Sequence, residues 1–150
     1  MRRFGSASAG LSAARERAQG VARALTSTGD SSAQLAGLNQ LCEMLNTGTE
    51  ETLASLRPEA ILPGVVQIMQ TSMNPDLTIL ATRAMTYFVD AIPGSTNAVA
   101  SCGGVDAVAT FLLEIRDIEL AEQALVCLDK IAQENPAILL QSRGPEAFLL

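Results

Sequence analysis

Hydrophobic residues recur every three or four positions along most of the chain, and the alternation expected of half-buried strands is scarce. In the segment 35–45, Leu35, Leu38, Leu41 and Leu45 form one such stripe. This spacing places apolar side chains on one face of an α-helix. Similar long stripes occupy residues 77–88 and 119–132. The pattern therefore predicts an all-α fold in which short, medium and long helices follow one another.

Polar start signals support these helices. Ser31-x-x-Gln34 has the form of a capping box in front of a long helix at 31–46. Asn74-Pro75 is a turn signal, and the next long stripe begins directly after it. Both signals stand where an apolar stripe begins, so they predict helix starts at these two places.

The chain also carries an internal repeat. A single shift along the sequence, without a gap, superposes the following pairs: Leu80 on Leu120, Ala84 on Ala124, Phe88 on Leu128, Val99 on Leu139 and Gly104 on Gly144. The first stripe matches the second at a somewhat larger shift, which a longer loop absorbs. A period of about 40 is typical of three-helix units. We therefore predict an armadillo-type right-handed superhelical solenoid, with Gly104 and Gly144 as turn glycines in a conformation that other residues resist.

The repeat register divides the chain into six segments. We expect a disordered tail at 1–10, a leading helix at 11–26 and the long helix of a partial repeat at 31–46. Armadillo repeats are predicted at 47–92 and 94–133, and 135–150 is the start of a further repeat that is truncated. The segment 1–30 is rich in Ala, Ser and Arg, which is also the composition of an organelle transit peptide, so targeting stays open as an alternative.

The amino-acid composition excludes several kinds of catalytic site, metal site and binding partner. The chain has no His, which excludes imidazole general bases, Ser-His-Asp systems and His-containing zinc sites. Its net charge is −6, with the positive charge concentrated in the segment 1–30, so a polyanionic partner such as nucleic acid is disfavoured. No apolar stretch approaches the length that a membrane-spanning helix needs, so we expect no such helix.

The three cysteines offer no catalytic site either. Cys42, Cys102 and Cys127 lack the short paired spacing of a metal site or disulfide framework. No base stands near any of them in sequence, so a reactive thiolate is not expected. We interpret them as free thiols of a reducing compartment, with Cys42 packed inside and Cys127 projecting outward. No catalytic, cofactor-binding or metal-ligating residue is assigned.

Two levels of family resemblance are visible. The string "AVASCGGVDAVATFLL" followed by "DIELAEQALVCLDKIAQENP" resembles armadillo repeats. The strings "LNQLCEMLNTGTEETLASL" and "NPDLTILATRAMTYFVDAIPGS", followed by "DIELAEQALVCLDKIAQENPAILL", resemble more closely the N-terminal armadillo region of the HECT-type ubiquitin ligases of the plant KAKTUS and animal thyroid-receptor-interactor group. This second resemblance covers roughly residues 10 to 150.

The resemblance implies ubiquitin transfer by the parent protein and a non-catalytic role for this segment. In that family a distant HECT domain accepts ubiquitin on a cysteine from a conjugating enzyme and transfers it to substrate lysines. The resemblance implies that this chain, which lacks the HECT domain and so looks like a fragment, supplies substrate recognition or scaffolding. Its partners would be protein substrates or extended peptides bound on the concave face, and the protein itself would be located in the nucleus and/or cytoplasm. A free-standing armadillo adaptor without a link to ubiquitin is the alternative.

The resemblance to armadillo repeats implies a candidate partner-binding groove on the long helices. Nuclear-import adaptors of similar fold clamp basic peptides with a Trp and an Asn four positions apart on each long helix. The corresponding positions here are Ala36 and Gln40, Arg83 and Tyr87, and Gln123 and Cys127, so the Trp-Asn ladder is missing and an importin-like role is disfavoured. The candidate groove residues are Gln40, Glu43, Arg83, Tyr87, Asp90, Gln123, Cys127 and Lys130. Tyr and Arg are favoured interface residues, so Tyr87 and Arg83 are the strongest of them.

Overall fold

The computed structural model of this protein describes the backbone of residues 2–140 and the side chains of residues 12–140. Within them the regular structure consists of helices, with no strand. The helices are α1 (Arg2–Leu25), α2 (Ser31–Thr47), α3 (Glu50–Ser55), α4 (Pro58–Thr71), α5 (Pro75–Ala91), α6 (Thr96–Ser101), α7 (Gly104–Leu113), α8 (Ile118–Glu134) and α9 (Pro136–Leu139).

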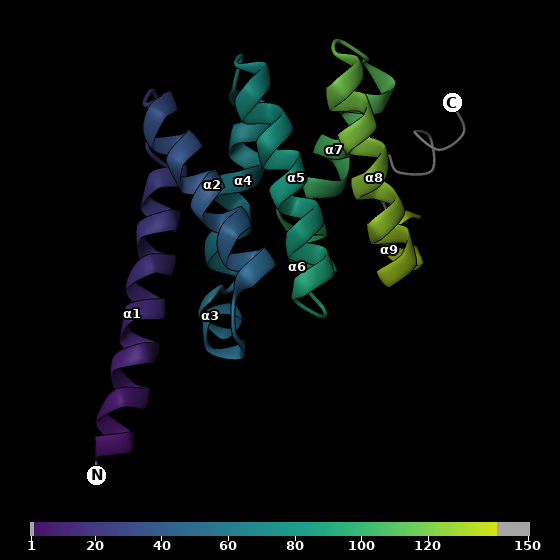
Figure 1. Ribbon diagram of the computed structural model, residues 1–150. Helices are drawn as coiled ribbons and strands as arrows, with labels where there is room; N and C mark the ends of the chain where they lie inside the picture. Colours follow the sequence, from purple (N-terminus) through teal and green to yellow (C-terminus); the bar gives the residue numbers. More distant parts are fainter. Residues whose placement is uncertain (1, 141–150) are drawn as a thin grey trace.

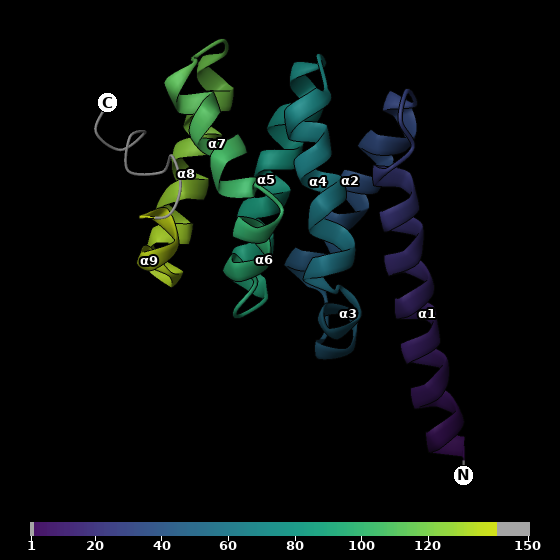
Figure 2. The ribbon, with the colours of Figure 1, turned by 180° about the vertical axis from the view of Figure 1, so that it is seen from behind.

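The helices stack in two layers (Figures 1 and 2). The long helices α2, α5 and α8 lie side by side and form one layer, while α1, α4 and α7 form the layer behind it. The short helices α3, α6 and α9 lie at the lower end of the layers in Figure 1. Two units, α3–α4–α5 and α6–α7–α8, thus repeat the same three-helix arrangement. The predicted all-α helical-repeat solenoid is confirmed.

The apolar stripes form one continuous core between the layers. Leu41 on α2, Phe88 on α5 and Leu128 on α8 occupy equivalent register positions, and all three are fully buried. Each contributes about 1.5–3 kcal/mol of hydrophobic stabilisation by leaving water. Because each unit buries its stripe against its neighbours, the core runs along the stack instead of closing into a sphere.

The turn between α6 and α7 contains two glycines, and the one with the left-handed backbone is not the one predicted. Gly103, not Gly104, has the left-handed backbone, with φ +82. Gly104 is the first residue of α7, and a Cβ there would lie 2.7 Å from Val99 Cγ1 and 2.9 Å from Met85 Cε. Gly104 is therefore required by close packing, because α6 and α5 approach its Cα directly.

The helix starts also refine the prediction. The N-cap of α2 is Asp30, whose carboxylate accepts a hydrogen bond of 3.0 Å from the Ala33 amide, so Ser31 already lies in the first turn. Asp and Ser cap equally well, and the capping-box pattern selected the wrong one of the two neighbours. Asn74 caps α5 as its turn signal indicated, through a 3.0 Å hydrogen bond from the amide of Asp76 to its side-chain oxygen.

The first helix is longer than predicted. α1 begins at Arg2, so the disorder expected for residues 1–10 is absent from the backbone of residues 2–10. This segment has no Pro, and its Ala and Arg residues favour helix enough to continue it past Gly5 and Gly10. From Ala14 to Leu25, α1 buries one apolar stripe and packs on α2 and α4 as a second-layer helix. Residues 141–150, with the predicted match at Gly144, lie outside the described residues.

Candidate interaction surface

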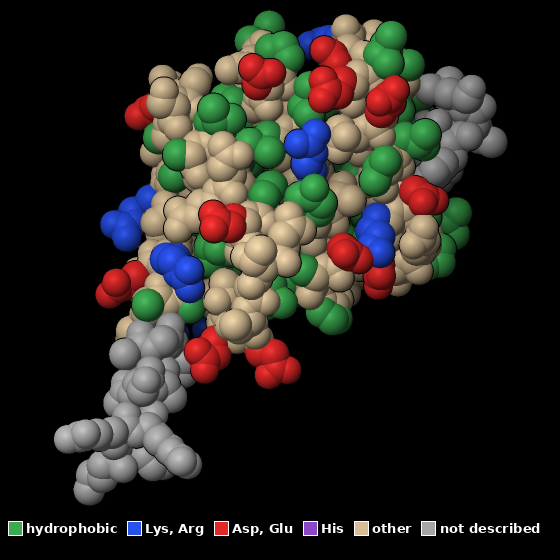
Figure 3. All heavy atoms as spheres, viewed as in Figure 1, with side chains coloured by type: hydrophobic (Ala, Val, Ile, Leu, Met, Phe, Trp, Pro, Cys, Tyr) green, Lys and Arg blue, Asp and Glu red, His purple; other side chains and the backbone are tan. Residues whose placement is uncertain are grey.

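The outward side of α2, α5 and α8 carries most of the predicted groove residues, and we call it the long-helix face. It consists of Gln40, Glu43, Arg83, Tyr87, Asp90, Gln123 and Lys130. Figure 3 views the molecule from this side and shows basic and acidic side chains scattered among hydrophobic ones. The repeat brings these positions together because each is one of three equivalent places on adjacent helices. The face is polar and mixed in sign.

Arg83 and Tyr87 lie one turn apart on α5, in the middle of the long-helix face. Both are half-buried, and Tyr87 packs against the edge of the core. Arg83 lies close enough to α2 for its charge to favour the Cys42 thiolate. The chain thus holds an aromatic ring and a guanidinium with restricted freedom at the centre of the face, a combination enriched at interface hot spots.

An ion pair joins α5 to α8 on the same face. The Nζ of Lys130 lies 2.6 Å from Asp90 Oδ1, and this hydrogen bond raises the pKa of the lysine above its ordinary value. The Asp90 side chain is 63% exposed and that of Lys130 27%, so water screens the attraction. Pairs of this kind contribute at most about 1 kcal/mol. The pair orders the two side chains more than it stabilises the fold.

Cys127 does not lie on the long-helix face, contrary to the prediction. It is fully buried between α8 and α5, where burial raises the pKa of its thiol to about 12 and a side-chain hydrogen bond with Thr86 partly offsets the rise. At the equivalent register positions, Gln40 is exposed and Tyr87 is half-buried, because their longer side chains reach past the helix contact. A small thiol at this position is covered by the neighbouring helix.

The other two thiols are also poorly suited to act as nucleophiles. Cys42 is half-buried against the core, near to the interior position predicted for it, and burial raises its pKa to about 11. Burial likewise raises the pKa of Cys102. A thiol nucleophile needs a lowered pKa, which none of the three has. Among residues 12–140, no group of His, Cys, Asp or Glu side chains is arranged to hold a metal ion.

Sequence reasoning missed a second surface, at the edge where the α4–α5 and α7–α8 turns meet. We call it the turn groove, a cavity of about 600 Å³ whose lining includes Met69, Met73, Phe111, Glu114, Arg116 and Leu120. The signal available in the sequence was the presence of Met73, Ile115 and Ile118 around the turns. These residues do not by themselves indicate a groove, because the two turns are far apart in the chain. They meet only when the two repeat units stack.

A polar hollow also adjoins the long-helix face. It lies between α1, α2 and α3, has a volume of about 760 Å³, and includes Arg17, Gln40 and Glu43 in its lining. Gln40 and Glu43 therefore belong both to the long-helix face and to this hollow, which extends the face toward α1. None of the described helices is long and apolar enough to cross a lipid bilayer.

The described part of the chain is thus a two-layer stack of helical repeats with a polar long-helix face. The family model described as "E3 ubiquitin-protein ligase TRIP12-like, TPR repeats" matches residues 5–141, and the chain belongs to this family. The description names TPR repeats, which are two-helix units with a period of about 34. The units of this chain have three helices, and one repeat separates Leu80 from Leu120, so their geometry is of the armadillo kind.

Curated relatives agree with the family. The chain is 38% identical over 125 residues to the E3 ubiquitin-protein ligase UPL3 of Arabidopsis thaliana, a match that covers 83% of this chain and 7% of that protein. It is 35% identical over 142 residues to TRIP12 of Danio rerio, covering 93% of this chain and 7% of that ligase. UPL4 of Arabidopsis thaliana is 36% identical over 125 residues, covering 83% and 8%. The chain thus spans less than a tenth of these relatives. No solved structure matches it.

Proposed function

We propose that this chain is the protein-interaction region of an E3 ubiquitin ligase and that it binds protein substrates, or extended peptides within them, on the long-helix face. The observation that carries the proposal is the Arg83–Tyr87 pair, half-buried at the centre of a polar face in a chain of the TRIP12-like ligase family. The Trp-Asn ladder of import adaptors is absent from the equivalent positions, which supports a client other than basic import peptides.

The side chains of the face suit an extended peptide. Gln40 on α2 and Gln123 on α8 each offer amide donors and acceptors, which can pair with a peptide backbone. Tyr87 offers an aromatic ring between them, and Arg83 offers a bidentate donor for a carboxylate. Because Asp90 and Lys130 already pair with each other, they present little net charge. Recognition would therefore rest on the amides, the ring and the guanidinium.

In the whole ligase this binding would serve ubiquitin transfer. A conjugating enzyme would deliver ubiquitin to the HECT cysteine of the parent protein, and the repeat region would hold the substrate so that its lysines reach that thioester. The gain would come from effective concentration, since a bound substrate meets the thioester in an intramolecular encounter. We also propose the nucleus and/or cytoplasm as the location, with support from the three free cysteines.

The test uses the chain as a competitor. When tagged chain is expressed in excess in cells, it should occupy the substrates of the intact ligase and lower their ubiquitylation. The Arg83→Glu/Tyr87→Ala variant should bind those proteins at least about tenfold more weakly, since two interface anchors are lost, and should leave their ubiquitylation unchanged. Quantitative mass spectrometry of bound proteins and of ubiquitin remnants measures both effects.

Two outcomes would contradict parts of this proposal. If the chain and its variant bind the same proteins equally, the long-helix face is not the binding surface. If the variant loses partners whose ubiquitylation never responds to excess chain, the region is a scaffold without a link to ubiquitin, which is the adaptor alternative. An Arg15→Glu variant makes the same charge change as Arg83→Glu on the exposed side of α1, so it controls for a general effect of charge.

A further inference from the structure

The turn groove has the shape and lining of a binding site. Its volume of about 600 Å³ lies within the range of about 300–1,000 Å³ that is usual for ligand sites. Met69 and Leu120 are buried and Phe111 is half-buried, so the apolar lining is fixed to the packed helices α4, α7 and α8. The groove is thus built on the rigid part of the stack, although turns form its edges.

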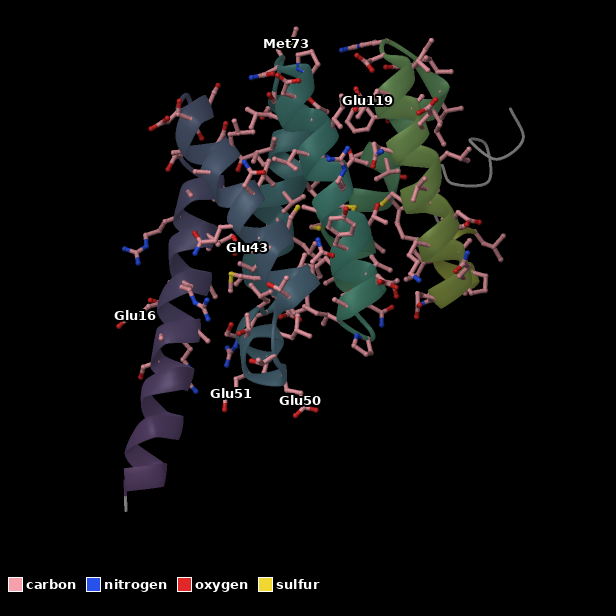
Figure 4. The ribbon with its side chains drawn as sticks, viewed as in Figure 1. Glu16, Glu43, Glu50, Glu51, Met73 and Glu119 are labelled. Carbon is pink, nitrogen blue, oxygen red and sulfur yellow. The ribbon has the colours of Figure 1, made fainter. Side chains whose placement is uncertain are left out.

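Apolar side chains also surround the opening. Met73 is 88% exposed in the α4–α5 turn and lines the groove, and Figure 4 shows it at the upper edge of the molecule. Ile115 and Ile118, beside the lining residues of the α7–α8 turn, are 64% and 75% exposed. Large apolar side chains gathered at an opening mark interaction sites. Methionine in particular adapts its unbranched side chain to different partners.

The charge of the groove is acidic. Among the described residues, its ionisable lining side chains are the carboxylates of Asp106, Glu114 and Asp117 and the guanidinium of Arg116, whose formal charges sum to −2. The Nη2 atom of Arg116 lies 4.0 Å from Oε2 of Glu114, and both side chains are largely exposed. Figure 3 shows acidic and hydrophobic side chains next to one another along the upper edge. An occupant complementary to this lining must combine apolar and basic groups.

We propose that the turn groove is a second docking site, distinct from the long-helix face, for a protein segment in which large apolar side chains are flanked by Lys or Arg. The apolar side chains would contact Met69, Phe111 and Leu120, and the flanking cations would lie against Glu114 and Asp117. Met73 lines the same groove from the α4–α5 turn. The proposal depends on the geometry and charge of the groove, and it stands whether or not the long-helix face binds substrates.

The test measures binding of three fluorescein-labelled peptides to the purified chain by fluorescence anisotropy. The first has the core Lys-Arg-Phe-Leu-Arg-Lys, the second replaces the cations by Glu and Asp, and the third replaces Phe-Leu by Ser-Ser. The first should bind at least about tenfold tighter than either of the others, because only it satisfies both the charge and the apolar lining. Raising the salt concentration should weaken it, since the charged rim is screened.

Variants locate the peptide. Glu114→Lys and Met73→Lys should each weaken the first peptide at least about fivefold by charge repulsion at the rim. Glu16→Lys makes the same charge change as the first variant on a distant exposed position of α1, and it should leave binding unchanged. Arg83→Glu/Tyr87→Ala should also leave it unchanged. Circular dichroism of each variant would be measured to check that it is folded.

Several results would overturn the proposal. They are equal binding of the acidic peptide, no binding of the first peptide up to about 1 mM, or equal weakening by Glu16→Lys. Loss of binding only in the Arg83 and Tyr87 variant would assign the peptide to the long-helix face. The segment Arg2-Arg3-Phe4 of this chain has the same chemistry. Concentration-dependent dimers in sedimentation, abolished by Met73→Lys, would make a second copy the occupant and contradict an external partner.

Discussion

Replacing Gly104 by alanine tests how tightly the three-helix units are joined. The new Cβ would lie 2.7 Å from Val99 Cγ1, 2.9 Å from Met85 Cε and 2.9 Å from the Val99 carbonyl oxygen. The methionine end can move, but the carbonyl belongs to the backbone of α6 and cannot shift alone. Overpacking of this kind costs about 1–3 kcal/mol, and the helix propensity of alanine returns less than about 1 kcal/mol. We expect a net loss of about 1–2 kcal/mol.

Gly20→Ala is the matched control. Gly20 lies inside α1, where an added Cβ would have no neighbour within 4 Å, so the same substitution should stabilise the protein by about 0.5–1 kcal/mol. Urea unfolding followed by circular dichroism measures both. With a slope of about 2 kcal/mol/M, the midpoint should fall by about 0.5–1 M for Gly104→Ala and rise by about 0.25–0.5 M for Gly20→Ala. An unchanged or higher midpoint for Gly104→Ala would refute the packing argument.

Four further changes test other parts of the structure. Because burial raises the pKa of Cys127 to about 12 from 9.0 in the unfolded chain, unfolding free energy should fall as pH rises above 9, by up to about 1.4 kcal/mol per pH unit, and Cys127→Ala should flatten that fall in urea titrations at pH 8 to 10.5. A double-mutant cycle of Asp90→Asn and Lys130→Met should give a coupling below about 1 kcal/mol that shrinks in about 1 M NaCl; a larger, salt-insensitive value would contradict solvent screening. Asp30→Ala should cost about 1 kcal/mol in thermal unfolding, through the lost cap of α2, and no loss would show that water replaces the cap. Phe88→Ala should cost about 3–5 kcal/mol because its side chain is fully buried, and a loss below about 1 kcal/mol would mean that the core collapses around the cavity.

The long helices could be predicted from the sequence because their apolar stripes are unbroken and recur in register. Leu41, Phe88 and Leu128 align by simple shifts, and each is fully buried at the same place in its unit. The exact ends of the helices were harder to predict from the sequence. Asp30 and Ser31 are both good N-caps, and the choice between them depends on the backbone of the preceding turn, which the pattern does not contain.

The surfaces depended on geometry that no pattern in one helix carries. The burial of Cys127 follows from the short reach of a thiol and the closeness of α5, whereas Tyr87 at the equivalent position is long enough to emerge. The turn groove unites Met73 with Glu114 from turns of two different units, so it exists only once the units stack. The register of the long-helix face was predictable; the depth of each residue in it was not.

The central place of α5 has a consequence for how the long-helix face would bind. α5 packs against α2 on one side, α8 on the other and α4 beneath, so it has neighbours on three sides. In a stack held by nearest-neighbour contacts, the ends open first, and the amide hydrogens of α5 should exchange with solvent only on global unfolding. Arg83 and Tyr87 would therefore stand on the helix expected to exchange most slowly. A partner that meets them loses little additional conformational entropy, because the surface is already ordered before contact.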